Sequence, residues 1–163
     1  EKNAECRLVL YKNCRNTAEI GSMAGEIVGL KLKSYVNEVH GLPPQTEYYK
    51  DEKQLWRIAE KFVREMLEQG MSTDDFVVLT VRSVQHSLLK ADKLCGFPVS
   101  ETQEKGKVRF TSVRKFKGLE AKAVLLIDAQ KSKIDDALQQ RIMYVGCSRA
   151  NTYLLMAIMD DID

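Results

Sequence analysis

Zinc-binding motifs, membrane spans and low-complexity stretches are all absent from this sequence of 163 residues. Its four cysteines form no Cys-x-x-Cys pair and it has only two histidines, so the closely spaced ligand pairs of a zinc site are missing. With three prolines and nine glycines, it is neither collagen-like nor a flexible linker. No apolar run approaches the roughly 18 residues of a transmembrane helix, and no signal-type apolar region follows the first residues. We therefore predict one cytoplasmic domain over 1–163, with reduced cysteines, no bound metal and no membrane partner.

Charge is nearly balanced overall but uneven along the chain. Twenty-five basic and 23 acidic residues give a net charge of +2. The 14 residues from Glu104 to Lys117 include six basic residues and one acidic residue, which gives +5 and leaves −3 for the rest. The six are Lys105, Lys107, Arg109, Arg114, Lys115 and Lys117. Such a run suits contact with a nucleic-acid backbone, because lysine and arginine release counterions from phosphates. A solvated charged hairpin is the alternative, and charge alone does not exclude it.

Apolar runs of strand length alternate with amphipathic helical patterns along the chain. The predicted strands cover residues 6–11, 46–49, 76–81, 107–111, 123–128 and 153–158. The predicted helices run from Asn16 to about Leu30, over 55–67, from Ser83 to about Cys95, and from about Ile134 to Cys147. This alternation predicts an α/β fold, a three-layer parallel sheet with helices on both faces. Ligands in such folds bind at the carboxyl ends of the strands, which here points to the loops after residues 11, 81, 111 and 128.

The sequence lacks the phosphate-binding loop of a nucleotide hydrolase, G-x-x-x-x-G-K-[ST]. Its one Gly-Lys pair, Gly106-Lys107, is followed by Val108. The segment 51–54, Asp-Glu-Lys-Gln, spells the D-E-x-Q of a magnesium-binding acidic box, but that box should end an apolar strand and an amphipathic helix begins here. We interpret Asp51 and Glu52 as helix N-terminal acids that favour the helix dipole.

Three segments near the predicted strand ends carry candidate chemistry. Residues 13–17 (Asn-Cys-Arg-Asn-Thr) form a strand-to-helix turn with an arginine. Residues 114–120 (Arg-Lys-Phe-Lys-Gly-Leu-Glu) combine cations, a glycine that lets the backbone approach a ligand, and a carboxylate. Residues 140–150 end a helix in Ser-Arg-Ala, from which an arginine can point into a neighbouring domain's phosphate site. Taken singly, a surface arginine and a basic turn explain the first two segments as well.

In this order the three segments resemble the C-terminal motor domain of superfamily 1 helicases of the UvrD/Rep type. That family has N-x-R-S/N-T, then T-x-H-x-x-K-G-L-E, then Y-V-A/G-x-T/S-R-A, and the resemblance spans about residues 8–158. It implies a RecA-like P-loop-NTPase fold without the P-loop, the second (2A) lobe of such a motor. Only about 30 residues separate the segment at residues 79–80 from the second motif, so we expect no large accessory (2B) insertion. The N-terminal ATPase lobe is expected to be absent from this chain.

The resemblance also implies roles for individual residues in binding ATP. Arg15 matches the arginine that reaches the γ-phosphate, and Arg149 matches the arginine finger. Gly118 and Glu120 match the segment that contacts the nucleotide, with the carboxylate on a ribose hydroxyl. ATP and Mg²⁺ are expected to be held mainly by the N-terminal lobe, which makes this lobe a partner of the chain.

A second set of residues matches the family's contacts with a single strand of DNA. Ser112, Arg114 and Lys117 match the strand-contacting end of the second motif, and Thr80 and Arg82 lie where the family often has another contact. Ser112 and Arg114 depart from the Thr and His of the family pattern. The serine keeps the hydroxyl, whereas the arginine can stack on a base or hold a phosphate instead of presenting an imidazole.

The function implied is that of the C-terminal motor domain of an ATP-dependent DNA helicase that binds single-stranded DNA. We expect the chain alone neither to hydrolyse ATP nor to unwind DNA. Two alternatives stay open: a module that binds nucleic acid or RNA polymerase without motor activity, and an RNA-directed helicase. Phosphate contacts cannot separate DNA from RNA, because they carry no sugar identity.

Overall fold

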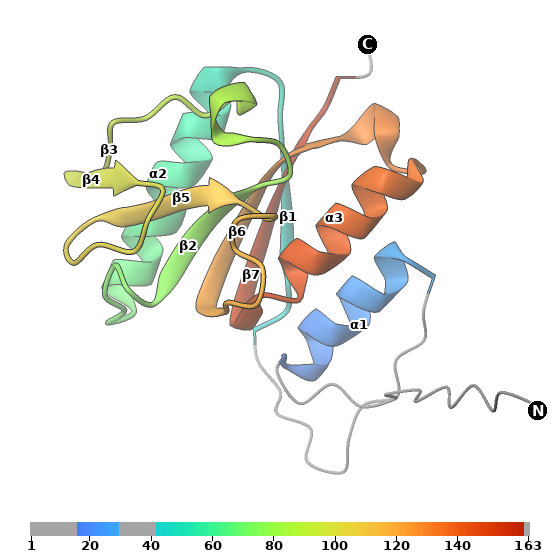
Figure 1. The fold of residues 1–163 in the computed structure, drawn as a ribbon, viewed down its shortest axis with the longest axis horizontal. Helices are drawn as coiled ribbons and strands as arrows, with labels where there is room; N and C mark the ends of the chain where they lie inside the picture. The colour runs from blue at the N-terminus through green and yellow to red at the C-terminus, as the bar shows by residue number, and fades with distance from the viewer. Residues whose placement is uncertain (1–15, 30–41, 162–163) are drawn as a thin grey trace, which may run out of the picture.

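The computed structural model describes residues 16–29 and 42–161, and Figure 1 shows their arrangement. The predicted strand 6–11 and Arg15 lie outside the described residues. The helices are α1 (Ala18–Ile27), α2 (Glu52–Glu68) and α3 (Ala137–Cys147), with short 3-10 turns η1 (Val84–His86) and η2 (Lys131–Lys133). The strands are β1 (Gln45–Tyr49), β2 (Phe76–Thr80), β3 (Lys93–Leu94), β4 (Phe97–Ser100), β5 (Val108–Ser112), β6 (Ala121–Gln130) and β7 (Ala150–Met159).

The seven strands form one sheet in the order β1-β7-β6-β2-β5-β4-β3. Every neighbouring pair is parallel except β3 and β4, which are antiparallel. β2 lies in the middle of the sheet and all five of its residues are buried, as expected for a strand covered on both faces. The predicted α/β fold is therefore confirmed.

Helices cover both faces of the sheet, with α2 on one side and α1 and α3 on the other (Figure 1). Because successive strand residues point to opposite faces, β6 serves two cores. Leu125 and Ile127 pack with α2, whereas Val124 and Leu126 pack with α1 and α3. This arrangement gives the three layers predicted from the alternation of strands and helices.

The amphipathic pattern of α2 correctly predicted a helix, and its start explains the acidic segment 51–54. The side chain of Asp51 accepts a hydrogen bond from the backbone N–H of Gln54 at 2.8 Å, so Asp51 is the N-cap of α2. Gly70, with a φ of +86°, lies just beyond the helix in the left-handed region that favours glycine. Asp51 is therefore a helix-capping acid, as interpreted from the sequence.

The predicted helix from Ser83 to about Cys95 is wrong. This stretch has only the short turn η1, followed by β3 and the start of the β3–β4 hairpin. The Ser87 hydroxyl and the Leu88 N–H both donate to the buried carboxylate of Asp128, at 2.6 and 3.0 Å. These contacts, made across 40 residues or more of sequence, draw the chain onto the end of β6 in place of a helical path.

Two predicted helix boundaries also need correction. α1 is capped by Thr17, since the Asn16 side chain bonds elsewhere, and it ends at Ile27 before Gly29, which has a φ of +69°. α3 begins at Ala137, three residues later than predicted, because the Asp136 side chain caps it by accepting from the Gln139 N–H. Within the described residues, no helix is long and apolar enough to cross a membrane.

Candidate functional site

The predicted site residues divide between two opposite edges of the sheet. We call the edge where β2, β5 and β6 end the carboxyl edge, and the edge where β6 and β7 begin the amino edge. The predicted strand-contacting residues at the carboxyl edge are Thr80, Arg82, Ser112 and Arg114, which end or follow β2 and β5. The predicted nucleotide-contacting residues at the amino edge are Gly118, Glu120 and Arg149, which precede β6 and β7. Sequence reasoning had placed ligands at the carboxyl ends of the strands, and only the first set lies there.

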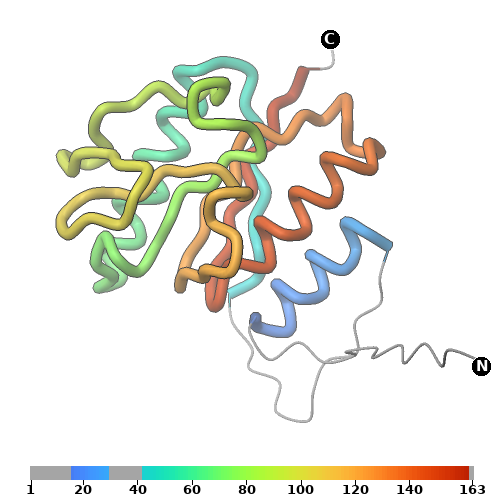
Figure 2. The backbone as a smooth tube through the Cα atoms, viewed as in Figure 1, coloured from blue at the N-terminus to red at the C-terminus, as the bar shows by residue number. Residues whose placement is uncertain are grey.

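One short segment, residues 113–120, joins the two edges. It leaves the end of β5, crosses the face of the sheet that carries α1 and α3, and enters β6 (Figure 2). Val113 and Phe116 are buried in the core on that face, while Lys117 and Gly118 are exposed. Gly118 has a φ of +80°, a conformation that other residues rarely adopt. The segment is thus fixed by apolar anchors and exposes polar groups between them.

Backbone hydrogen bonds hold the residues of the amino edge together. The carbonyl of Arg149 accepts from the N–H of Ala121 at 3.0 Å, which places Glu120 beside the arginine-bearing turn. Arg149 itself is half-buried, and its own N–H donates to the carbonyl of Gly146 at 3.1 Å. The amino edge therefore carries an arginine and a glutamate, Arg149 and Glu120, that belong to two different segments of the chain.

The residue that follows Arg15 is docked on the same edge. The side-chain amide of Asn16 donates to the carbonyl of Ser148 at 2.9 Å and also to the carbonyl of Ala150. These two carbonyls flank Arg149 in the sequence. The first and third predicted motifs thus meet here, although Arg15 itself lies outside the described residues.

Close packing under the end of α3 fixes the path of the chain into Arg149. Gly146 is buried, and a Cβ atom added there would lie 2.7 Å from Cδ1 of Leu126 and 3.1 Å from Cγ2 of Val113. The absence of a side chain lets α3 approach β6 and the start of the 113–120 segment. Gly146 therefore has a packing role within the third motif.

The two predicted site residues with hydroxyl groups at the carboxyl edge, Thr80 and Ser112, are buried. Thr80 pairs with Ser112 across β2 and β5 and is fully buried. Its hydroxyl donates to Asp128 at 2.6 Å and accepts from the N–H of Arg82 at 3.0 Å. Ser112 is also buried, and its hydroxyl accepts from the N–H of Lys115 at 3.2 Å. Both hydroxyls shape the loops, so the groups available to a ligand at this edge are the cations that follow them.

Asp128 is a member of this edge that the sequence analysis did not assign to the site. It is buried, has a φ of +70°, and accepts hydrogen bonds from Thr80, Ser87 and Leu88. Its own N–H donates to the Tyr49 hydroxyl at 3.2 Å, and burial together with the Asp128 charge raises the pKa of Tyr49. The carboxylate thus ties the loop after β2 to the end of β6. The only signal in the sequence was an acid that ends an otherwise apolar strand.

The basic run contains fewer available cations than its sequence suggested. Lys115 pairs with Glu101 at 2.6 Å and Lys107 pairs with Glu104. The Arg109 guanidinium carbon lies 5.0 Å from the centre of the Phe116 ring, which helps to anchor the 113–120 segment, and partial burial lowers the pKa of Arg109. The cations of the run with neither a charged partner nor an aromatic partner among the described residues are Lys105, Arg114 and Lys117.

Comparisons with known proteins agree with this architecture. The chain has a mostly parallel α/β sheet, and its 3D structure is similar to the crystal structure of the C-terminal domain of "a possible DNA helicase" from Lactobacillus plantarum WCFS1. The TM-score is 0.70 with 21% sequence identity, over 89% of this chain and 86% of that one, and at this identity the likeness concerns the fold.

The sequence comparison matches one segment of the chain to a family model. Residues 107–157 match the family model of the UvrD-like helicase C-terminal domain, and they include the second and third motifs. The predicted resemblance to this domain is therefore confirmed. No curated protein sequence matches the chain.

Proposed function

We propose that this chain is the C-terminal motor domain of an ATP-dependent superfamily 1 DNA helicase. In this proposal Arg15 and Arg149 face the phosphates of ATP bound by an N-terminal lobe, and Glu120 faces the ribose. Single-stranded DNA lies along the carboxyl edge. The observation that supports the proposal most strongly is the separation of the two residue sets onto opposite edges, joined by the 113–120 segment.

The donor set at the amino edge fits a nucleotide. A guanidinium is planar and always charged, so Arg149 can neutralise charge on a phosphoryl group, and such arginines contribute roughly 10³–10⁵ in rate in related systems. The Glu120 carboxylate can accept from a ribose hydroxyl, and Gly118 allows close approach of the backbone. Among the described residues, no group of three His, Cys, Asp or Glu side chains could hold a metal ion. In this proposal Mg²⁺ is held by the N-terminal lobe, as the resemblance implies.

The carboxyl edge fits a phosphate backbone. Arg114 is exposed at this edge and has no charged partner in the described part of the chain, and Arg82 follows the end of the neighbouring strand β2. Lys117 is also exposed and without a charged partner in that part, further along the 113–120 segment. Closure of the N-terminal lobe on Arg149 and Glu120 would press on the 113–120 segment, whose other end carries Arg114. The proposed motor thereby couples the two edges through hinge-type motion of the lobes.

Binding of the 163-residue chain to labelled oligonucleotides, measured by fluorescence anisotropy over a range of salt concentrations, tests the proposal. We expect binding to single-stranded DNA that weakens with salt, and we expect Arg114→Gln to weaken it and lower the salt slope by about one. Arg57→Gln on α2 is the matched control, since it removes the same charge from an exposed site on a helix.

Three results would contradict the proposal. Failure of the chain to bind single-stranded DNA would remove the DNA-binding part. Much tighter binding to a matched RNA oligonucleotide would favour an RNA-directed helicase. ATP turnover by the purified 163-residue chain, lost on Arg149→Gln, would contradict the assignment of the phosphate-binding loop to another lobe.

A further inference from the structure

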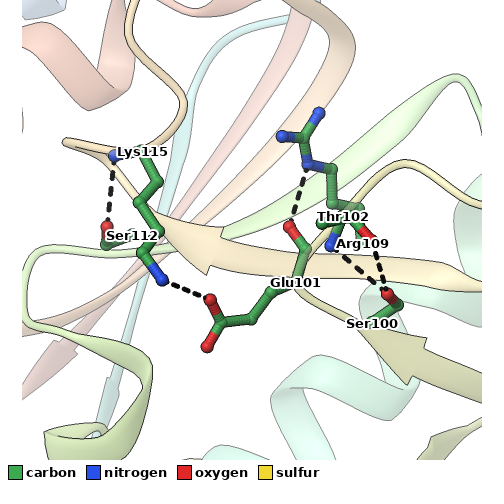
Figure 3. Close-up of polar contacts among 6 residues, drawn as sticks. All are labelled: Ser100, Glu101, Thr102, Arg109, Ser112 and Lys115. Carbon is green, nitrogen blue, oxygen red and sulfur yellow. Dashed lines mark hydrogen bonds and ion pairs between the residues drawn. The ribbon is translucent and has the colours of Figure 1, made fainter.

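One ion pair lies at the carboxyl edge, close to the residues proposed to contact the strand. Glu101 directly follows β4 and Lys115 follows β5, which are parallel neighbours in the sheet. Lys115 Nζ lies 2.6 Å from Glu101 Oε2 (Figure 3). The two side chains are 62% and 33% exposed, so the pair is open to solvent.

Hydrogen bonds fix the backbones of Glu101 and Lys115, whereas their exposed side chains can change partner. The N–H of Lys115 donates to the hydroxyl of Ser112, and Nε of Arg109 donates to the carbonyl of Glu101 at 3.4 Å (Figure 3). Glu101 also lines a hollow of about 420 Å³ together with Lys90. Exposed ion pairs contribute little net stability, so another anion can replace the carboxylate on Lys115.

We propose that Lys115 is a further phosphate contact of this edge and that Glu101 competes with nucleic acid for it. The proposal rests on the function proposed above. In the free protein the Glu101 carboxylate occupies the lysine, and a phosphate of the bound strand takes its place. Glu101 therefore lowers the affinity of the edge for nucleic acid, whereas Arg82, Arg114 and Lys117 attract the strand without such competition.

The chain offers a matched control in a second ion pair. Glu104 pairs with Lys107 in the same basic run, with both side chains 42% exposed. Lys107 precedes β5, so this pair lies at the opposite end of the strand from Lys115. Glu104→Gln and Glu101→Gln remove the same charge from similar exposed pairs. Only the change at Glu101 releases a cation at the carboxyl edge.

A double-mutant cycle on the 163-residue chain tests the proposal. The probe is a fluorescein-labelled oligodeoxythymidine of about 20 nucleotides, long enough to cover one domain. We expect Glu101→Gln to tighten binding about two- to fivefold, as release of an exposed ion-pair partner allows. We expect Lys115→Gln to weaken binding and to lower the salt slope by about one. In the Lys115→Gln background, Glu101→Gln should have no more effect than Glu104→Gln has in the wild type.

The outcomes separate this proposal from the proposed function. If the wild type binds and Arg114→Gln weakens binding, but Glu101→Gln changes nothing, the competition is overturned and the function stands. Equal tightening by Glu101→Gln and Glu104→Gln would also overturn it, because the effect would then be one of overall charge. Absence of binding by the wild type would overturn both. Lys115→Arg should retain both binding and the Glu101→Gln effect, which shows that loss in Lys115→Gln reflects charge and not folding.

Discussion

The two edges of the sheet hold their proposed functional residues by different means. At the amino edge, backbone hydrogen bonds and the Asn16 amide join the turns around Arg149 and Glu120. At the carboxyl edge, the buried side chain of Asp128 gathers the loop after β2. Backbone hydrogen bonds persist when the side chains they position are substituted. Substitution of a buried carboxylate, in contrast, leaves its three donors without an acceptor. We therefore expect the stability of the amino edge to depend on close packing, and that of the carboxyl edge to depend on the Asp128 carboxylate.

The largest expected effect is on ATP turnover, which we expect to depend on the amino edge. In a protein that contains the N-terminal lobe, Arg149→Gln should lower ATP turnover by roughly 10³–10⁵, because the guanidinium would stabilise charge on the transferred phosphoryl group. Affinity for single-stranded DNA should stay close to that of the wild type, since Arg149 lies at the amino edge. Steady-state ATP hydrolysis and anisotropy measure the two quantities.

The control for this prediction is Arg141→Gln, which removes an exposed arginine from α3 in the same motif. It should leave ATP turnover unchanged. A comparable loss in both variants, or loss of DNA binding in Arg149→Gln, would show that the edges are not separate.

The next effect concerns the buried carboxylate. Asp128→Ala leaves the donors of Thr80, Ser87 and Leu88 without an acceptor, and we expect it to lower the free energy of unfolding by about 3 kcal/mol or more. Asp128→Asn keeps an acceptor oxygen and suits the positive φ, so it should cost markedly less. Urea denaturation followed by circular dichroism compares the two. Equal losses would mean that the hydrogen bonds of the carboxylate do not stabilise this edge.

The smallest effect tests packing at the amino edge. Gly146→Ala should lower the free energy of unfolding by about 1–3 kcal/mol, because the new methyl group would press on Leu126 in a filled core. The sign is informative, since glycine to alanine within a helix otherwise stabilises by up to about 1 kcal/mol. Thermal denaturation decides between the signs. Stabilisation would show that α3 has room to move away from β6.

Elements set by local pattern were predictable, and those set by distant contacts were not. The apolar face of α2 and the apolar runs of β2, β6 and β7 specify their own structure. The segment after Ser83 was wrongly predicted as a helix. Its Ser87 and Leu88 groups bond to Asp128, and no local pattern reveals a partner that far along the chain.

The same distinction applies to the candidate site. Its motifs could be found because each is a short contiguous segment. The pairing of Glu101 with Lys115 depends on β4, a four-residue strand interrupted by Pro98, which no strand pattern predicted. Assignment of Glu120 and Arg149 to the amino edge likewise needed the strand order and the crossing 113–120 segment.

Hydrogen exchange of the 163-residue chain, measured by mass spectrometry with and without single-stranded DNA, tests the separation of the two edges most directly. The account predicts that DNA slows exchange in residues 81–88 and 112–117, at the carboxyl edge, and leaves residues 146–151 unchanged. Slower exchange centred on residues 146–151, with none in the other two segments, would contradict it.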